Sequence, residues 1–246
     1  MNIKLLIILI LADCAMVAGY AQSSGNRQAL QAMRGLVESY EHARYLSFDL
    51  LYRVRAEEDA GTWLDSLSGS CKMNGKNYWY AMDNTESIGC TGYTVMLFKD
   101  DRVMYLARPR AKATGMNPLA MLDSLLSAKD ITATVSEERG EGKIILAFPP
   151  GSLYKRITYF INQKSGLIDR VLNVVKSDQL YDPEAWEKLT NHEQYAIMEI
   201  QFSHYRQGGF DESQFDPHRY FIKEGTEYKT TVNYQDYTIF LGSTDL

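Results

Sequence analysis

The chain has 246 residues, with 26 basic and 31 acidic side chains and a formal net charge of −5 at neutral pH. This acidic balance, without a run of Lys and Arg, argues against a nucleic acid partner and leaves no sequence stripe that would draw the chain onto anionic lipid. The length is sufficient for one sizeable hydrophobic core.

Residues 1–21 have the pattern of an export signal. Lys4 supplies a positive charge, Leu5–Leu11 is an unbroken apolar run, and Gly19 and Ala21 place small residues at −3 and −1 of a cleavage site. The run is too short for a membrane span of about 20 residues. We therefore expect an exported, periplasmic protein whose residues 22–246 form a single domain. Cys14 leaves open a lipid-anchored form, which Asp13 directly before it disfavours.

The first predicted elements of the mature chain are one helix and one long strand. Residues 26–43 carry apolar side chains at three- and four-residue spacing, which predicts an amphipathic helix docked on the protein's own sheet. Residues 45–56 alternate strictly, which predicts a strand. Its apolar face consists of Leu46, Phe48, Leu50, Tyr52 and Val54.

Short strand-like runs separated by tight turns follow, which predicts an antiparallel meander. The Asn74-Gly75 pair between two β-rich runs is a strong hairpin signal. Apolar residues lie on both faces of these runs, with Val95 on one and Met96 on the other, so the strands should be covered on both sides. The predicted strands are 64–73, 77–83, 86–91, 93–99 and 102–108.

The remainder of the chain reads as further antiparallel strands with two helices between them. Asn117-Pro118 and Asp182-Pro183 each combine an N-cap residue with proline at the first helical position. The tail from 208 to 246 is too rich in aromatic residues for disorder and should pack back on the sheet, with one edge strand at 237–241. The other predicted strands are 131–137, 143–148, 154–162, 167–176 and 193–205.

Cys71 and Cys90 are the two cysteines outside the leader. An even pair in an oxidising compartment is typical of a disulfide. In a regular meander, however, these residues lie on strands separated by a third, about 9.6 Å apart, which exceeds the roughly 7 Å Cα separation that a disulfide allows. The sequence leaves the bridge open.

No local motif indicates catalysis or metal binding. His192-Glu193 lacks the second histidine of a zinc-protease motif, because Ala196 occupies that position. The Ser66–Ser70 segment lacks the order of a nucleophile elbow, and neither cysteine has a metal-ligand partner at the right spacing. We therefore expect a protein without catalytic residues, metal or cofactor.

The order of elements, together with one short segment, resembles a known family. Gly69–Met73 runs through a basic turn into the aromatic strand Asn77–Tyr80. This pattern of a glycine, a short strand, a basic turn and an aromatic strand is similar to the start of the periplasmic outer-membrane lipoprotein carriers of the Lol type. The sequence departs from those carriers in lacking their usual Arg-Pro in the turn and in having a longer aromatic tail.

The resemblance implies a mainly β (α+β) fold, a curved antiparallel sheet or incomplete β-barrel with helices on its concave face. A half barrel of about 8 to 11 strands leaves an interior too wide for its own side chains to fill. The resemblance implies a site there for lipid or lipoprotein acyl chains, each buried CH₂ contributing about 0.8 kcal/mol. The candidate lining residues are Phe48, Leu50, Tyr52, Val95, Leu97, Met198, Ile200 and Phe202.

Two functions therefore stand as expectations. The first is a non-catalytic carrier whose partner is a lipid or an acylated protein. The second is a structural or interaction module of the cell envelope, which docks a protein partner through its aromatic-rich C-terminal region.

Overall fold

The computed structural model describes residues 24–43, 45–58, 61–108, 130–180 and 194–242. The expected export signal and the two helices expected from Asn117 and Asp182 lie outside the described residues. Within these ranges, no helix has the length and apolarity needed to cross a membrane.

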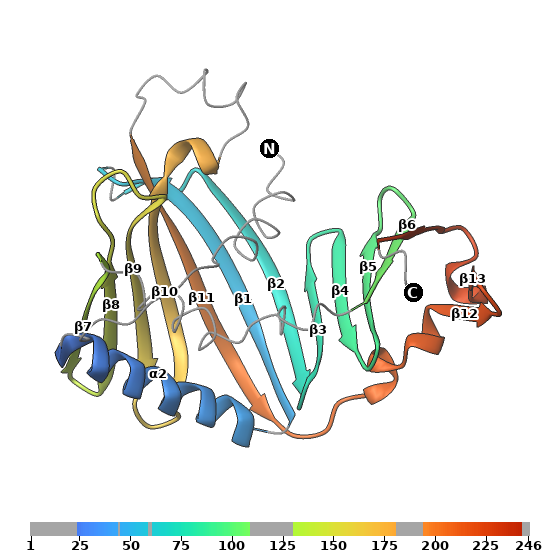
Figure 1. Cartoon of the computed structure of the whole chain (residues 1–246), viewed down its shortest axis with the longest axis horizontal. Helices are drawn as coiled ribbons and strands as arrows, with labels where there is room; N and C mark the ends of the chain where they lie inside the picture. The colour runs from blue at the N-terminus through green and yellow to red at the C-terminus, as the bar shows by residue number, and fades with distance from the viewer. Residues whose placement is uncertain (1–23, 44, 59–60, 109–129, 181–193, 243–246) are drawn as a thin grey trace. The chain divides into compact units, whose positions relative to one another are not determined.

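Most of the described chain forms one sheet of 12 strands, and a separate two-stranded sheet lies in the C-terminal region (Figure 1). The strands before residue 109 are β1 (Tyr45–Ala56), β2 (Asp65–Asn74), β3 (Asn77–Met82), β4 (Thr85–Cys90), β5 (Tyr93–Phe98) and β6 (Val103–Ala107). Those that follow are β7 (Thr132–Glu138), β8 (Glu141–Ala147), β9 (Tyr154–Asn162), β10 (Leu167–Lys176), β11 (Tyr195–Gln207), β12 (Phe221–Glu224), β13 (Glu227–Thr230) and β14 (Thr238–Leu241).

The large sheet is open and almost wholly antiparallel. Its order is β14-β6-β5-β4-β3-β2-β1-β11-β10-β9-β8-β7, so β14 and β7 are its two edges. The exception to antiparallel pairing is β14, which lies parallel to β6. The predicted mainly β class is confirmed, and the sheet has 12 strands where about 8 to 11 were expected.

The chain divides into two compact units, and both contribute strands to the sheet. Unit 1 comprises Met1–Tyr40, Leu51–Ser66 and Gly115–Phe202. Unit 2 comprises Glu41–Leu50, Leu67–Thr114 and Ser203–Leu246.

In unit 1, one face of the sheet is covered by the helix α2 (Ser24–His42), which the sequence predicted at 26–43 (Figure 1). Met33 is fully buried among side chains of β8, β9 and β10. Buried Asn26 fastens the start of the helix, because its side chain donates to the carbonyl of Ile131 (3.2 Å) and accepts from the amide of Ala133 (3.0 Å). The helix thereby satisfies polar backbone groups where the chain enters the edge strand β7.

In unit 2, the C-terminal region packs on the strands β3 to β6. Short 3₁₀ turns at Glu212–Phe215, Pro217–Arg219 and Val232–Tyr234 alternate with the β12–β13 hairpin and lead into β14. The prediction that the tail folds back and ends in an edge strand is confirmed. The hairpin was missed, although Gly225 at φ +62° makes its turn.

Truncation of Met33 tests the packing of α2. Met33→Ala should lower the free energy of unfolding by about 2–5 kcal/mol, because it leaves a cavity between the helix and the sheet. Urea denaturation followed by circular dichroism measures the change. Arg34→Ala is the matched control at the neighbouring exposed position and should shift stability by no more than about 0.5 kcal/mol. Equal effects would contradict the docked position of α2.

Candidate ligand-binding surface

Cross-strand register sorts the side chains of unit 2 onto two faces. Residues directly opposite each other on neighbouring strands project to the same side of a sheet. One row is Cys71, Tyr80, Ser87, Met96, Tyr105 and Phe240. The neighbouring row on the opposite face is Lys72, Trp79, Ile88, Val95, Leu106 and Leu241.

The second of these faces, here the tail-covered face, is filled by the protein's own side chains. Val95 is fully buried and Leu97 is 1% exposed, and both belong to one apolar cluster with Tyr220 and Phe221 of the C-terminal region. Phe221 also makes an edge contact with Tyr93, with ring centroids 5.0 Å apart. The cluster closes this side of the meander.

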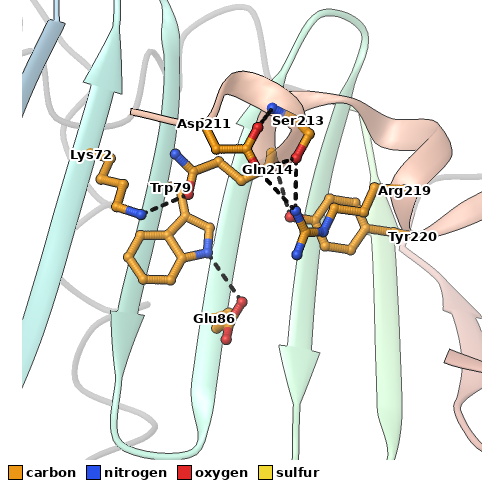
Figure 2. Close-up of polar contacts among 8 residues, drawn as sticks. All are labelled: Lys72, Trp79, Glu86, Asp211, Ser213, Gln214, Arg219 and Tyr220. Atoms are coloured by element: carbon orange, nitrogen blue, oxygen red, sulfur yellow. Dashed lines mark hydrogen bonds and ion pairs between the residues drawn. The ribbon is translucent and has the colours of Figure 1, made fainter. Parts of the chain in front are cut away.

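Polar contacts hold the tail in place over this cluster (Figure 2). The Tyr220 hydroxyl donates to the carbonyl of Gln214 (2.7 Å), and burial raises the pKa of that hydroxyl. Lys72 donates to the Gln214 side chain (3.1 Å), and its ammonium lies 4.7 Å from the centroid of the Trp79 ring. The Trp79 indole in turn donates to Glu86 (3.1 Å). Buried Gln214 of the tail is thus tied to β2, and the contacts of Lys72, Trp79 and Glu86 link β2, β3 and β4.

A second set of contacts shapes the tail itself. Asp211 accepts from the amide (2.9 Å) and the hydroxyl (2.7 Å) of Ser213, and these hydrogen bonds lower the pKa of its carboxyl. Arg219 donates to the same hydroxyl (2.9 Å). This exposed cluster closes the turn that begins the C-terminal region, and it needs no ligand to explain it.

The opposite face, here the Met–Tyr face, is apolar but incompletely covered. Besides Ser87, its side chains include Cys71, Tyr78, Tyr80, Met82, Met96, Phe98, Tyr105 and Phe240. Of these, Cys71, Tyr80 and Met82 are buried. Along β5, Met96 and Phe98 are half-buried, whereas Val95 and Leu97 between and beside them are almost inaccessible. Phe240 is 52% exposed. Methionine and aromatic side chains that remain accessible on one surface are typical of adaptable apolar binding sites.

A glycine permits the ring of Tyr78 to lie flat on this face. A Cβ atom at Gly89 would stand 2.1 Å from the Cε1 atom of Tyr78, so no other residue fits beneath the ring. Tyr78 is opposite Gly89 in the β3–β4 register. Because Gly89 has no side chain, the Tyr78 ring can lie over its backbone, and the Met–Tyr face has a broad aromatic surface at this position.

Two of the predicted lining residues, Phe48 and Leu50, lie on the side of the Met–Tyr face. Asp49 between them accepts a hydrogen bond from Ser70 (3.0 Å), and Ser70 is opposite Ala81 on the tail-covered side. Because side chains alternate along β1, Phe48 and Leu50 project to the other face. Each is 3% exposed, and the Phe48 ring lies 5.2 Å from that of Tyr205.

The other predicted lining residues lie in apolar clusters elsewhere. In unit 1, buried Met198 packs with Val54 and Val175, and Tyr52 lies against that cluster. Ile200 lies against this cluster and the α2 cluster, and Phe202 lies against the α2 cluster. In unit 2, Val95 and Leu97 lie beneath the tail. Ligand contact by the eight residues stays a prediction.

The accessible residues of the Met–Tyr face that sequence reasoning did not select are Tyr78, Met96, Phe98, Tyr105 and Phe240. The sequence contained one usable signal, which was the apolar character of both faces of β5. It could not tell which face the tail covers, because the tail follows β5 by more than a hundred residues in the chain.

Among the described residues, no group of three or more His, Cys, Asp or Glu side chains is placed to hold a metal ion.

Cys71 and Cys90 are both present as free, buried thiols. They lie on β2 and β4 with β3 between them, which agrees with the separation argued from the sequence. Burial raises the pKa of Cys71 to about 12 and that of Cys90 to about 11. Both are therefore neutral and poorly nucleophilic near neutral pH.

Comparison with known proteins identifies structural neighbours only. No protein-family model matches the sequence, and no curated protein matches it. A LolA superfamily protein from Nitrosomonas europaea is 10% identical with a TM-score of 0.33, the match covering 76% of this chain and 98% of that one. Lipoprotein LppX from Mycobacterium tuberculosis is 14% identical with a TM-score of 0.36, covering 75% of this chain and 98% of that one.

A third neighbour is a chain of the MucA/MucB complex from Pseudomonas aeruginosa. It is 14% identical with a TM-score of 0.38, and the match covers 83% of this chain and 63% of that one. At such identities and TM-scores, these similarities say nothing of what this chain binds.

Thiol titration tests the burial of the two cysteines. In a Cys14→Ser variant kept without reductant, neither Cys71 nor Cys90 should react with a thiol reagent at pH 8 while the protein is folded, and both should react in denaturant. Because burial raises the pKa of each thiol in the folded protein, the neutral thiols contribute to folding stability in full below the ordinary thiol pKa. This contribution is lost as the pH rises through about 11 for Cys90 and about 12 for Cys71. Absence of reactive thiols in denaturant would instead reveal a disulfide.

Proposed function

We propose that this chain is an exported, non-catalytic binding protein for a hydrophobic ligand, and that it holds the ligand on the Met–Tyr face. The ligand class is the acyl chain of a lipid or of a lipoprotein. The observation that carries the proposal is the contrast along β5, where tail-side residues are sealed and Met96 and Phe98 remain half-buried.

The chemistry of the Met–Tyr face suits an acyl chain. Its side chains are mainly thioethers, phenyl rings and phenols, with the thiol of Cys71 and the hydroxyl of Ser87, and the row from Cys71 to Phe240 has no charged group. An acyl chain has no polar atoms to satisfy, and each CH₂ removed from water contributes about 0.8 kcal/mol. Such a surface needs shape and apolar area rather than a polar motif, which is consistent with a sequence without catalytic patterns.

A carboxylate placed on the Met–Tyr face tests the proposal. Met96→Glu should weaken binding of a fluorescent acyl-chain probe at least about tenfold, because the ligand would have to desolvate the new charge. The measurement is a fluorescence titration of the full chain, with folding verified by circular dichroism.

Ile222→Glu is the matched control for this titration. Ile222 is 46% exposed on β12, away from the Met–Tyr row, and the substitution adds the same charge at an apolar surface position. The control should bind the probe as the unmodified protein does. Equal binding by all three proteins would contradict the assignment of the Met–Tyr face, and absence of probe binding by the unmodified protein would contradict the function.

The exposed apolar side chains of the C-terminal region favour a second candidate function, that of an envelope interaction module. Ile222 is 46%, Val232 84% and Leu241 52% exposed. Most aromatic rings of the tail pack in the apolar cluster around Tyr220 and Phe221, so a protein partner would contact these aliphatic side chains. On this second function, Ile222→Glu should abolish capture of an envelope partner in a pull-down and Met96→Glu should preserve it, the reverse of the acyl-probe pattern.

A further inference from the structure

In unit 1, the sheet face opposite α2 carries a row of cations that alternates with aromatic and amide side chains. Lys143 on β8 is opposite Phe160 on β9, Phe160 is opposite Arg170 on β10, and Arg170 is opposite Gln201 on β11. The neighbouring residues on these strands, such as Ile144 and Val171, point to the α2 side. The row is here called the cationic face.

Aromatic rings orient the guanidinium groups on this face. The Arg170 guanidinium lies 4.0 Å from the centroid of Phe160, and that of Arg53 lies 4.2 Å from the centroid of Trp63. Arg55 also lies over Trp63, at 5.6 Å. Contact with an aromatic face limits the positions that each guanidinium group can take on this surface.

A single buried carboxylate balances two of these cations. Glu199 is 5% exposed and forms ion pairs with Arg53 and with Arg170, the latter at 3.7 Å. Its Oε1 atom also accepts from Gln201 (3.0 Å). The Nε–H of Arg53 is buried without an acceptor in the described structure. Two guanidiniums therefore share one acid, and the network retains positive charge.

Among the described residues that can be placed on the cationic face, cations exceed acids. Register and direct contacts place seven cations there, namely Arg53, Arg55, Lys143, Lys155, Arg156, Arg170 and Lys176. The same criteria place four acids there, namely Glu57, Glu138, Glu141 and Glu199. Since the chain as a whole carries −5, its other surfaces are correspondingly more acidic.

Apolar side chains fill the spaces between the charges. Ile145 and Leu172 are half-buried on this face, and Val174 and Ile197 are buried there. A surface of half-buried arginines, aromatic rings and aliphatic side chains differs from an ordinary solvated charged face. It matches the interfacial layer of a bilayer, where cations meet phosphates and aromatic rings lie at headgroup depth.

We propose that the cationic face docks the protein on an anionic lipid bilayer. The guanidinium and ammonium groups meet lipid phosphates, and the half-buried side chains of Ile145 and Leu172 contact the headgroup region. Each cation near such a surface strengthens binding about fivefold at low salt. The excess of cations over acids favours reversible attachment, which high salt weakens.

Co-sedimentation with vesicles tests this proposal. The full chain should sediment with vesicles of phosphatidylglycerol and phosphatidylethanolamine at low salt, and not with vesicles of phosphatidylcholine. Arg55→Gln with Arg156→Gln removes two cations from the face without touching Glu199, and should weaken binding about thirtyfold. The matched control is Arg27→Gln with Arg34→Gln, which removes two exposed arginines from α2 and should leave vesicle binding unchanged.

Three outcomes would overturn the proposal. Equal losses in the two double variants would show that net charge alone governs binding, and equal binding to both vesicle types would show apolar insertion without charge recognition. Failure to bind anionic vesicles, with binding of a polyglutamate peptide instead, would identify the face as a site for an acidic protein. The acyl-probe titration is independent of all three, because Met96 belongs to unit 2 and the substituted arginines belong to unit 1.

Discussion

Burial on both faces of one sheet is the physical constraint on which the rest of this structure depends. Strands such as β5 carry apolar side chains on both sides, so neither side can be left wholly to water. In unit 1, α2 covers one face and long cationic side chains with aromatic rings cover the other. In unit 2, the C-terminal region seals one face around Tyr220. On the remaining Met–Tyr face, Met96, Phe98 and Phe240 are less covered than Val95 and Leu97 on the other side of the same strands.

The tail-covered face, the cationic face and the Met–Tyr face are covered in different ways, and each can therefore bind different partners. Tyr220 and Phe221 are nearly inaccessible, so the tail-covered face is a core and offers nothing to a ligand unless the tail leaves it. The cationic face is protected by side chains whose aliphatic stems lie on the sheet while their charged ends reach solvent. It is therefore at once a cover and a charged surface. On the Met–Tyr face, Met96, Phe98 and Phe240 stay partly accessible in the described structure, and the row from Cys71 to Phe240 has no charged side chain, which is why it is the surface proposed for an apolar ligand.

Glu199 illustrates how a charged residue can serve both structure and surface chemistry. A carboxylate that is 5% exposed is tolerated because Arg53, Arg170 and Gln201 satisfy it. The same network fixes two guanidiniums in place beside Trp63 and Phe160. A pre-positioned cation loses less side-chain freedom on meeting an anion than a free lysine does.

The sequence by itself determined the helix α2 and the described strands other than β12 and β13, because alternation and three- to four-residue spacing are local properties. The bounds of β1, β9 and β10 agree with the predicted ones, and those of the meander differ by a residue or two. Only the tertiary structure decided that β14 joins β6 in parallel, that the tail covers Val95 rather than Met96, and that cations from several strands form one surface. These features depend on contacts between residues far apart in the chain, and residue spacing along one strand has no information about which distant segment will cover it.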